Sequence, residues 1–302
     1  MATVSTNDTT TLDRREAVSR TGRGPSVRPS RRLAGNPLGA LGGIIWLLVV
    51  VLPIYWIVVT SLRNQAGFFS TNPLALPTHP TFDNYQLVLQ SGFWRYLANS
   101  TIVTLASVVL TLAVSLMAAY AIVRGTSRAL RMTFSLFLLG LAIPLQATII
   151  PIYYLITRLR LYDSLTALVL PSVAFAIPLT VIILANFLRD VPGELFEAMR
   201  LDGAGDWRML WSLAIPLTRP AVITVAVYDA LQVWNGFLFA LILTQSPEKR
   251  VLPLALWTFQ GQFTVNVPAV LAAVILSTLP ILTLYVIGRR YLVAGLTAGF
   301  GK

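Results

Sequence analysis

A series of long apolar segments that carry no charge limits the folds available to this chain. Residues 44–62 and 96–123 contain no Asp, Glu, Lys or Arg. An α-helix of about 20 apolar residues crosses the hydrocarbon core of a bilayer. Both segments are long enough to do so, and similar segments follow them. We therefore predict an all-α protein that crosses a membrane several times.

The composition supports a membrane protein rather than a soluble one. The 302 residues are 56% hydrophobic and only 12% charged, and the mean hydropathy is +0.72, whereas soluble domains contain about 25% charged residues. The net charge of +11 would suggest nucleic acid binding in a soluble protein. In a membrane protein it is better explained by arginines that hold loops in the cytoplasm. We expect the lipid bilayer, and no nucleic acid, as a partner.

The sequence lacks the residues that many metal and nucleotide sites require. It has no Cys, which excludes disulfides and thiolate metal sites. His79 is the only histidine, so a site of the HExxH type is excluded. The sequence contains no GxxxxGK[ST] phosphate loop, so the chain cannot drive itself with ATP by that route. We expect no metal, no cofactor and no catalytic residue in this chain.

Six membrane spans are predicted, with polar or basic segments between them. Pro144 and Pro151 interrupt the third span, and Pro171 and Pro178 lie within the fourth. Residues 244–267 form a partly apolar connector whose fold the sequence leaves open. The predicted spans are residues 44–62, 96–123, 132–157, 164–188, 221–243 and 268–288.

The basic residues predict the orientation in the membrane. Residues 1–40 are rich in Thr, Ser, Arg, Gly and Pro, and we expect a disordered cytoplasmic tail there, followed by a transmembrane domain of residues 41–302. A secretory signal would need an apolar stretch much nearer the start. With the N-terminus inside, the inner segments hold 17 of the 23 Lys and Arg residues. Both termini, the C-terminal tail (residues 289–302) and residues 190–216 are therefore predicted to face the cytoplasm.

Residues 190–216, called here the loop 190–216, are charged although they lie between two predicted spans. Pro192 and Gly193 open the loop, an amphipathic run follows, and Gly203 and Gly205 break that run. Asp206 is expected to cap a second short helix. Two short helices around a glycine turn form a rigid projection that suits docking to a partner. The apolar residues expected on these helices are Leu195, Phe196, Met199, Trp207, Leu210 and Trp211.

The spacing within this loop resembles a known motif. Glu197-Ala198-Met199, three further residues, Gly203, nine further residues and then Leu213-Ala214-Ile215-Pro216 resemble the EAA loop of ABC importer membrane subunits. The family pattern is Glu-Ala-Ala, three residues, Gly, nine residues and Ile-x-Leu-Pro. Met199 replaces the second Ala, and Leu213 and Ile215 exchange two aliphatic residues, while the spacing is intact.

Three other stretches extend the resemblance to permease subunits of the MalG type in carbohydrate ABC importers. They are Phe82-Asp83-Asn84-Tyr85 with Asn99-Ser100, the pair Trp234-Asn235 with Phe237, and residues 293–299. The resemblance covers roughly residue 44 to the end. It implies the MetI/MalG-like fold of type I importers, with six spans and a cytoplasmic coupling loop, in a bacterial inner membrane. The implied partners are a second, MalF-like permease, two cytoplasmic ATPases that bind ATP and Mg, and an extracytoplasmic sugar-binding protein.

The resemblance also implies roles for particular residues. Glu197 would approach the ATPase, where a carboxylate can pair with an arginine at the rim of a groove, and Gly203 would end the first helix sharply. The alternatives are a solvated surface charge at Glu197 and an ordinary helix cap at Gly203. The implied coupling residues are Leu195, Glu197, Ala198, Met199, Asp202 and Gly203, although Leu195, Met199, Trp207 and Leu210 could equally pack under the loop.

The resemblance assigns the C-terminal tail a contact as well. It implies that Gly295, Leu296, Thr297 and Gly299 reach between the ATPase subunits. Plain disorder of these residues is the alternative.

A polar stripe on the fifth predicted span is the candidate substrate pathway. Asp229 is the only acidic residue placed inside a span, and such residues usually face a cavity or a partner. Gln232 and Gly236 share its helical face, and Asn235 lies at the edge of that face. Trp234, which is also assigned to the pathway, and Tyr228 are near by on other faces. The alternative is hydrogen bonding between the two permeases, and in the maltose system the partner permease supplies most of the substrate contacts.

The sequence thus predicts a permease subunit of a carbohydrate importer. A permease for a non-sugar solute shares the docking motif and remains the main alternative. An integral-membrane enzyme would need clustered catalytic carboxylates or histidines at a membrane face. A secondary transporter would normally show internal repeats, and none is seen.

Overall fold

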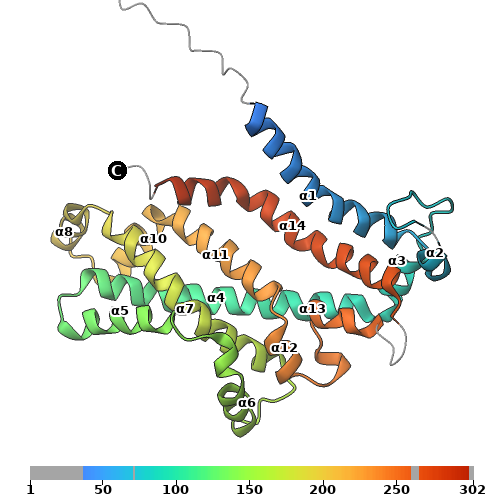
Figure 1. The fold of residues 1–302 in the computed structure, drawn as a ribbon. Coiled ribbons are helices and arrows are strands. Elements are labelled where there is room, and N and C mark those ends of the chain that lie inside the picture. The colour runs from blue at the N-terminus through green and yellow to red at the C-terminus, as the bar shows by residue number, and fades with distance from the viewer. Residues whose placement is uncertain (1–36, 71, 260–264, 299–302) are drawn as a thin grey trace, which may run out of the picture. The chain divides into compact units, whose positions relative to one another are not determined.

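The computed structural model describes residues 37–70, 72–259 and 265–298, and within them it is built of helices (Figure 1). The all-α prediction is therefore confirmed. Short π and 3₁₀ turns join some of the helices. The helices are α1 (Pro37–Ser61), α2 (Gln65–Ser70), α3 (Asp83–Val88), α4 (Trp94–Arg124), α5 (Arg128–Gly140), α6 (Ile149–Arg158), α7 (Leu165–Arg189), α8 (Gly193–Leu201), α9 (Asp206–Met209), α10 (Ile215–Leu217), α11 (Arg219–Trp234), α12 (Leu238–Leu243), α13 (Leu252–Ala255) and α14 (Val267–Ala298).

The chain divides into two compact units, residues 1–51 and residues 52–302. The described part of the first unit is the N-terminal portion of α1. Its side chains are apolar and exposed: Trp46 is 70% exposed and Leu47 is 58% exposed. Such a helix requires an apolar environment. Residues 1–36 of the expected N-terminal tail lie outside the described residues.

Among the residues that the structure describes, four helices are long and apolar enough to cross a membrane, and two bent helix pairs raise the number to as many as six. The straight spans are Leu38–Ser61, Asp83–Arg124, Leu165–Arg189 and Val267–Gly288, and the bent pairs are Arg128–Gly140 with Leu145–Arg158, and Asp206–Leu217 with Arg219–Trp234. These spans fit a multi-pass membrane protein.

Two predicted spans differ from the structure. The third is bent by 99°, and the 3₁₀ turn that follows the break begins directly after Pro144. Pro151 lies within the first turn of α6, where a missing N–H is tolerated, and does not interrupt the helix. The fifth predicted span was too long at its end, because α11 stops at Trp234 and α12 is a separate helix that begins at Leu238.

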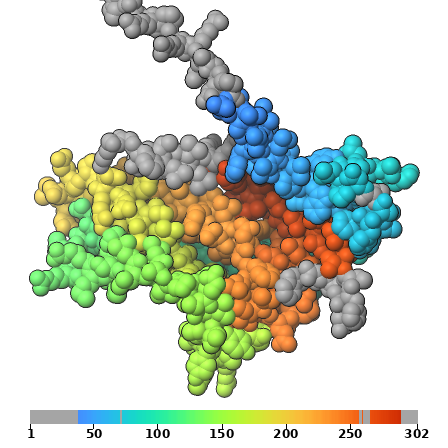
Figure 2. All heavy atoms as spheres, in the orientation of Figure 1, coloured from blue at the N-terminus to red at the C-terminus, as the bar shows by residue number. Residues whose placement is uncertain are grey.

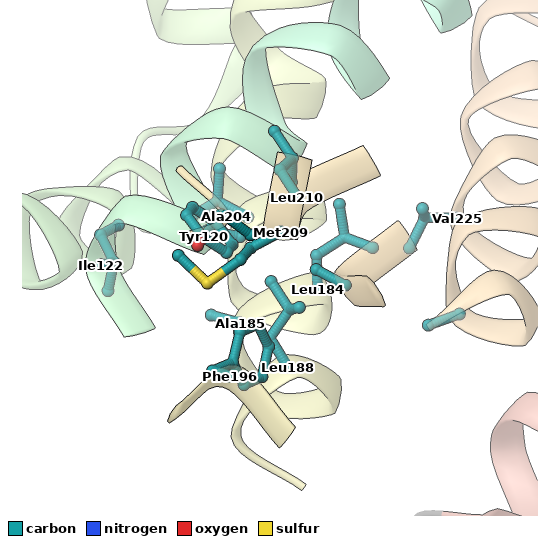
Figure 3. Packing of buried hydrophobic residues seen from close by; sticks show 14 residues of the cluster. Tyr120, Ile122, Leu184, Ala185, Leu188, Phe196, Ala204, Met209, Leu210 and Val225 are labelled. Atoms are coloured by element: carbon teal, nitrogen blue, oxygen red, sulfur yellow. The ribbon is translucent and has the colours of Figure 1, made fainter. Parts of the chain in front are cut away.

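Within the second unit, α4 packs along α7, and α11 packs against both α4 and α14. A buried apolar cluster lies where the loop 190–216 meets the ends of α4 and α7, and we call it the loop core (Figure 3). Its members are Ala119, Tyr120, Ile122, Val181, Leu184, Ala185, Leu188, Phe196, Ala204, Met209, Leu210, Ala214, Ala221 and Val225. Figure 2 shows the loop itself, in yellow, on the surface of this unit.

Candidate functional site: a docking loop and a polar cavity

The turn between α8 and α9 is a helix C-cap built on Gly203. The amide N–H of Ala204 donates to the carbonyl of Met199 at 2.9 Å, and the N–H of Gly203 donates to Arg200 at 3.0 Å. This pair of bonds is the Schellman motif, which requires the residue after the cap to be left-handed. Gly203 has φ +78°, and Asp202 is the C-cap residue. The cap interpretation of Gly203 is therefore right, and it also shapes the projecting turn.

The predicted cap of the second helix is wrong. Gly205, not Asp206, is the N-cap of α9, and it contributes no side-chain bond. Asp206 is the first helical residue, where a negative charge interacts favourably with the helix dipole. Its carboxylate accepts hydrogen bonds from Arg200 at 3.3 Å and from the Tyr120 hydroxyl at 3.4 Å.

One face of the loop is buried against α4 and α7. Phe196 is only 2% exposed, and Met209 and Leu210 are 1% and 3% exposed. Figure 3 shows these three side chains converging with those of α4 and α7. Packing under the loop is thus the correct interpretation for Leu210, and the half-buried Met199 also packs against the loop core.

The other face of the loop is exposed and mixes charge with large apolar side chains. Glu197, Ala198 and Asp202 are exposed, and no ion pair involves Glu197 in the part of the chain that the structure describes. Leu195 is 42% exposed and Trp207 is 62% exposed. Two further residues that the sequence did not assign to coupling, Leu201 and Trp211, are 90% and 63% exposed. Bulky apolar side chains beside an unpaired carboxylate form a surface suited to a partner.

The polar stripe on α11 faces a cavity of about 320 Å³. Asp229 is 2% exposed, and its carboxylate accepts a hydrogen bond from the Thr180 hydroxyl of α7 at 3.0 Å. Asp229, Gln232 and Gly236 all line the cavity, in agreement with their predicted common face. A buried carboxylate with one hydrogen bond retains acceptor capacity that a ligand could use.

Three expectations about this stripe are corrected. Trp234 turns away from the cavity and donates its indole N–H to the Ser277 carbonyl on α14 at 3.3 Å. Asn235 also does not line the cavity, and its amide returns to the Leu231 carbonyl at 2.8 Å. Tyr228, expected on another face, does line it.

The sequence missed much of the cavity wall. The break after Trp234 turns the chain back, so that residues beyond α11 join α7 around Asp229. The missed polar and aromatic lining residues are Ser172, Phe175, Phe237 and Phe239. Phe237 and Phe239 follow the Asn235-Gly236 pair, whose Gly is a common helix terminator, whereas the sequence analysis found no signal for Ser172 and Phe175 on α7.

The backbone of the C-terminal tail is helical as far as it is described. Helix α14 continues to Ala298 and includes Gly295, Leu296 and Thr297. Gly299 lies outside the described residues. The contact of these residues with ATPase subunits stays a prediction.

A comparison with protein families decides the family. The family described as "Binding-protein-dependent transport system inner membrane component" matches residues 112–297, which is more than half of the chain. The chain belongs to this family. It is a multi-pass permease subunit of an ABC importer.

Individual relatives match the permease over most of its length. It is 40% identical to the putative ABC transporter permease protein ORF2 of Caldicellulosiruptor sp. (strain Rt8B.4), over 85% of this chain and 94% of the relative. It is 31% identical to the trehalose/maltose transport system permease protein MalG of Thermococcus litoralis, over 86% of this chain and 94% of the relative.

A solved structure shares the fold. The permease matches a chain of a bacterial ABC transporter involved in the import of the acidic polysaccharide alginate. The TM-score is 0.75 at 25% identity, and the match covers 89% of this chain and 99% of that chain.

Proposed function

We propose that this permease belongs to an ATP-driven, binding-protein-dependent carbohydrate importer and forms half of its translocation pathway. The geometry of the loop 190–216 carries the coupling part of the proposal. Its buried face is fixed to the ends of α4 and α7, and its exposed face presents Glu197 beside Leu195 and Trp207. A rigid projection of this kind can transmit the movement of a docked ATPase.

The cavity around Asp229 supports a carbohydrate as substrate. Sugars offer hydroxyl groups for hydrogen bonds and apolar ring faces for aromatic contacts. The cavity combines both kinds of partner, namely Asp229 and Gln232 with Phe175 and Phe237. Two of the similar proteins named above are described as a trehalose/maltose transport permease and as a transporter involved in the import of the acidic polysaccharide alginate.

The importer would contain several other subunits. We propose a second, MalF-like permease that completes the pathway, two cytoplasmic ATPases that bind ATP and Mg, and an extracytoplasmic binding protein that delivers the sugar. The charge bias predicts that the loop 190–216 and both termini face the cytoplasm. This chain would then contribute no catalytic residue and no cofactor.

The mechanism proposed is alternating access. ATP binding closes the ATPase pair, which draws the docking loops of the two permeases together. The inner gate closes, the outer side opens towards the binding protein, and sugar enters the cavity; hydrolysis resets the cycle. The energy source is therefore ATP rather than an ion gradient.

Gentle purification through an N-terminal tag, followed by mass spectrometry and uptake assays, tests this proposal. An ATPase and a second permease should be recovered, and vesicles with internal ATP should accumulate labelled oligosaccharide in the presence of the binding protein. Accumulation of an amino acid or an oxyanion instead of sugar would favour the non-sugar importer. A particle without ATPase, even after crosslinking in the membrane, would favour a secondary transporter.

A further inference from the structure

We infer that α4 is a rod that carries the movement of the loop 190–216 to a segment at its far end, residues 244–252. This inference rests on the proposed function and adds a mechanical route to it. Figure 1 shows α4 running along the second unit, with α8 near one end and α13 near the other. Specific contacts attach α4 at both ends.

At the C-terminal end of α4, the loop 190–216 packs against the last turn of the helix through Phe196. The guanidinium carbon of Arg124 lies 4.1 Å from the centre of the Phe196 ring, and the Tyr120 ring lies 6.3 Å from it. A cation over an aromatic face is attractive, and more so when water is excluded. Phe196 is fully buried, so the contact is shielded. The hydrogen bond from Tyr120 to Asp206 attaches α9 to the same turn of α4.

These contacts connect parts of the chain that the backbone does not join. The loop continues directly from α7 and leads into α11. Helices α5, α6 and α7 lie between α4 and the loop in the chain, so a movement of the loop reaches α4 through side-chain packing, directly at Phe196 and Tyr120 as well as along α7 and α11. Phe196 and Asp206 are thus positioning residues for α4.

At the far end, α4 holds residues 248–252 by three hydrogen bonds. The Asn99 amide donates to the carbonyls of Glu248 and Arg250 at 2.8 and 2.9 Å. The Ser100 hydroxyl accepts from the N–H of Leu252 at 2.8 Å. All three bonds involve the backbone of the segment, so they fix its path whatever its side chains are.

The start of the same segment is fixed to the turn between α6 and α7. The Asp163 carboxylate accepts from the N–H groups of Gln245 and Ser246 at 2.9 and 3.0 Å, and from the Ser246 hydroxyl. A movement of α4 therefore reaches α6, which belongs to the bent third span, through residues 244–252. That segment also follows α12, which comes after the break beside the cavity.

Between its two attachments, α4 carries a stripe of small hydroxyl side chains for which the described residues offer no hydrogen-bond partner. The hydroxyls of Thr104, Ser107, Thr111 and Ser115 are buried and have no hydrogen-bond partner among the described residues. They lie on one helix face, at intervals of three or four residues. The middle of α4 is thus held to its neighbours by packing alone, while its ends are held by directional contacts. From Asn99 to Arg124 the helix spans about 38 Å.

A double-mutant cycle tests this route, because mutations so far apart usually have additive effects. The cycle combines Phe196→Leu, which keeps apolar volume but removes the ring face, with Asn99→Ala. The readout is Glu248→Cys, an exposed position on the far segment. The chain has no other cysteine, so its labelling reports on this site. The initial rate of maleimide labelling is measured on the reconstituted importer, first without nucleotide and then after trapping with ATP and vanadate. The label is quantified in this chain's band on a gel.

We expect trapping to change the labelling rate in the otherwise unaltered chain. Phe196→Leu and Asn99→Ala should each bring the ratio of the labelling rates with and without trapping closer to 1. The double variant should change this ratio no more than the single variant with the larger effect. Phe196→Tyr should retain the response. Phe134→Leu is the matched control, since Arg189 lies 4.7 Å from the Phe134 ring in a similar contact that does not involve α4. It should leave the ratio unchanged.

Additive losses, an unchanged ratio in either single variant, or no effect of trapping in the unaltered chain would each overturn the inference. If Asn99→Ala prevents assembly with the ATPase, Ser100→Ala takes its place in the cycle. Uptake and ATPase recovery with the unaltered importer test the proposed function separately. Normal uptake together with an additive cycle therefore refutes only the role of α4.

Discussion

The sharpest test of the docking loop is a pair of glycine substitutions in one turn. Gly203 has φ +78°, whereas Gly205 has φ −75°. A Cβ added at either position would meet no atom within 4 Å. The two sites therefore differ in backbone conformation and not in available space, so Gly205→Ala is a matched control for Gly203→Ala.

The expected cost follows from the backbone alone. A residue with a Cβ loses roughly 1–2 kcal/mol in the left-handed conformation. Both variants share the small gain from a less flexible unfolded chain, about 0.4–1 kcal/mol, so their difference isolates the strain at Gly203. If docking requires the turn, this strain lowers the affinity for the ATPase by roughly 5- to 30-fold. Gly203→Asn should fall between the two, because Asn tolerates this conformation better than Ala.

The assay is equilibrium binding of the purified ATPase to the permease in lipid nanodiscs, accompanied by uptake per ATP hydrolysed. Gly203→Ala should insert normally, bind the ATPase more weakly and transport less sugar for each ATP. Gly205→Ala should match the unaltered chain. Equal affinities for the two alanine variants would show that the left-handed turn is not needed for docking. Normal uptake by Gly203→Trp, whose bulk would project towards a docked partner, would refute the docking role of the loop itself.

Three further predictions use other parts of the structure. Asp229→Ala should raise the KM for sugar uptake while the ATPase and the second permease still co-purify; loss of the second permease would favour the packing alternative. The hydrogen bond from the Ser246 hydroxyl lowers the pKa of Asp163 below its usual 3.8. The hydrogen bonds that hold residues 245–246 to the Asp163 carboxylate are therefore fully present above pH 3.8, and they are lost as the pH falls through the lowered pKa. Amide exchange at these residues should stay equally protected from about pH 8 to about pH 5 and be faster in Asp163→Asn; a loss of protection near pH 6 would contradict this. Leu210→Ala should cost about 2–5 kcal/mol of stability, whereas Trp207→Ala should leave the melting temperature unchanged and weaken ATPase binding; the reverse pattern would invert the two faces of the loop.

Properties that depend on short stretches of sequence were predicted well. Residues 96–123 and 164–188 became α4 and α7 with ends shifted by only one or two residues, because a span must be apolar along its whole length. The turn at Gly203 was predicted because a glycine after an amphipathic run is a local signal for a helix end.

The sequence could not show which residues of the loop 190–216 face the loop core. Leu195 and Phe196 are adjacent apolar residues on α8, and either could have faced inward. Phe196 is buried because that side of α8 meets the last turn of α4, whereas Leu195 is 42% exposed. The choice depends on the angle at which the loop returns to the bundle, which no local pattern contains.

The sequence alone was enough to predict that the chain is helical, crosses the membrane and carries, between two spans, a charged loop with a glycine turn. Each of these follows from the solvation of a segment or from the conformational limits of one residue. The contacts between distant helices were not predictable in this way: Asp229 on α11 meets Thr180 on α7, Trp234 turns to α14, and Asn99 holds residues 248–250. These contacts join residues 43 to 151 positions apart, and their existence depends on how whole helices break and pack.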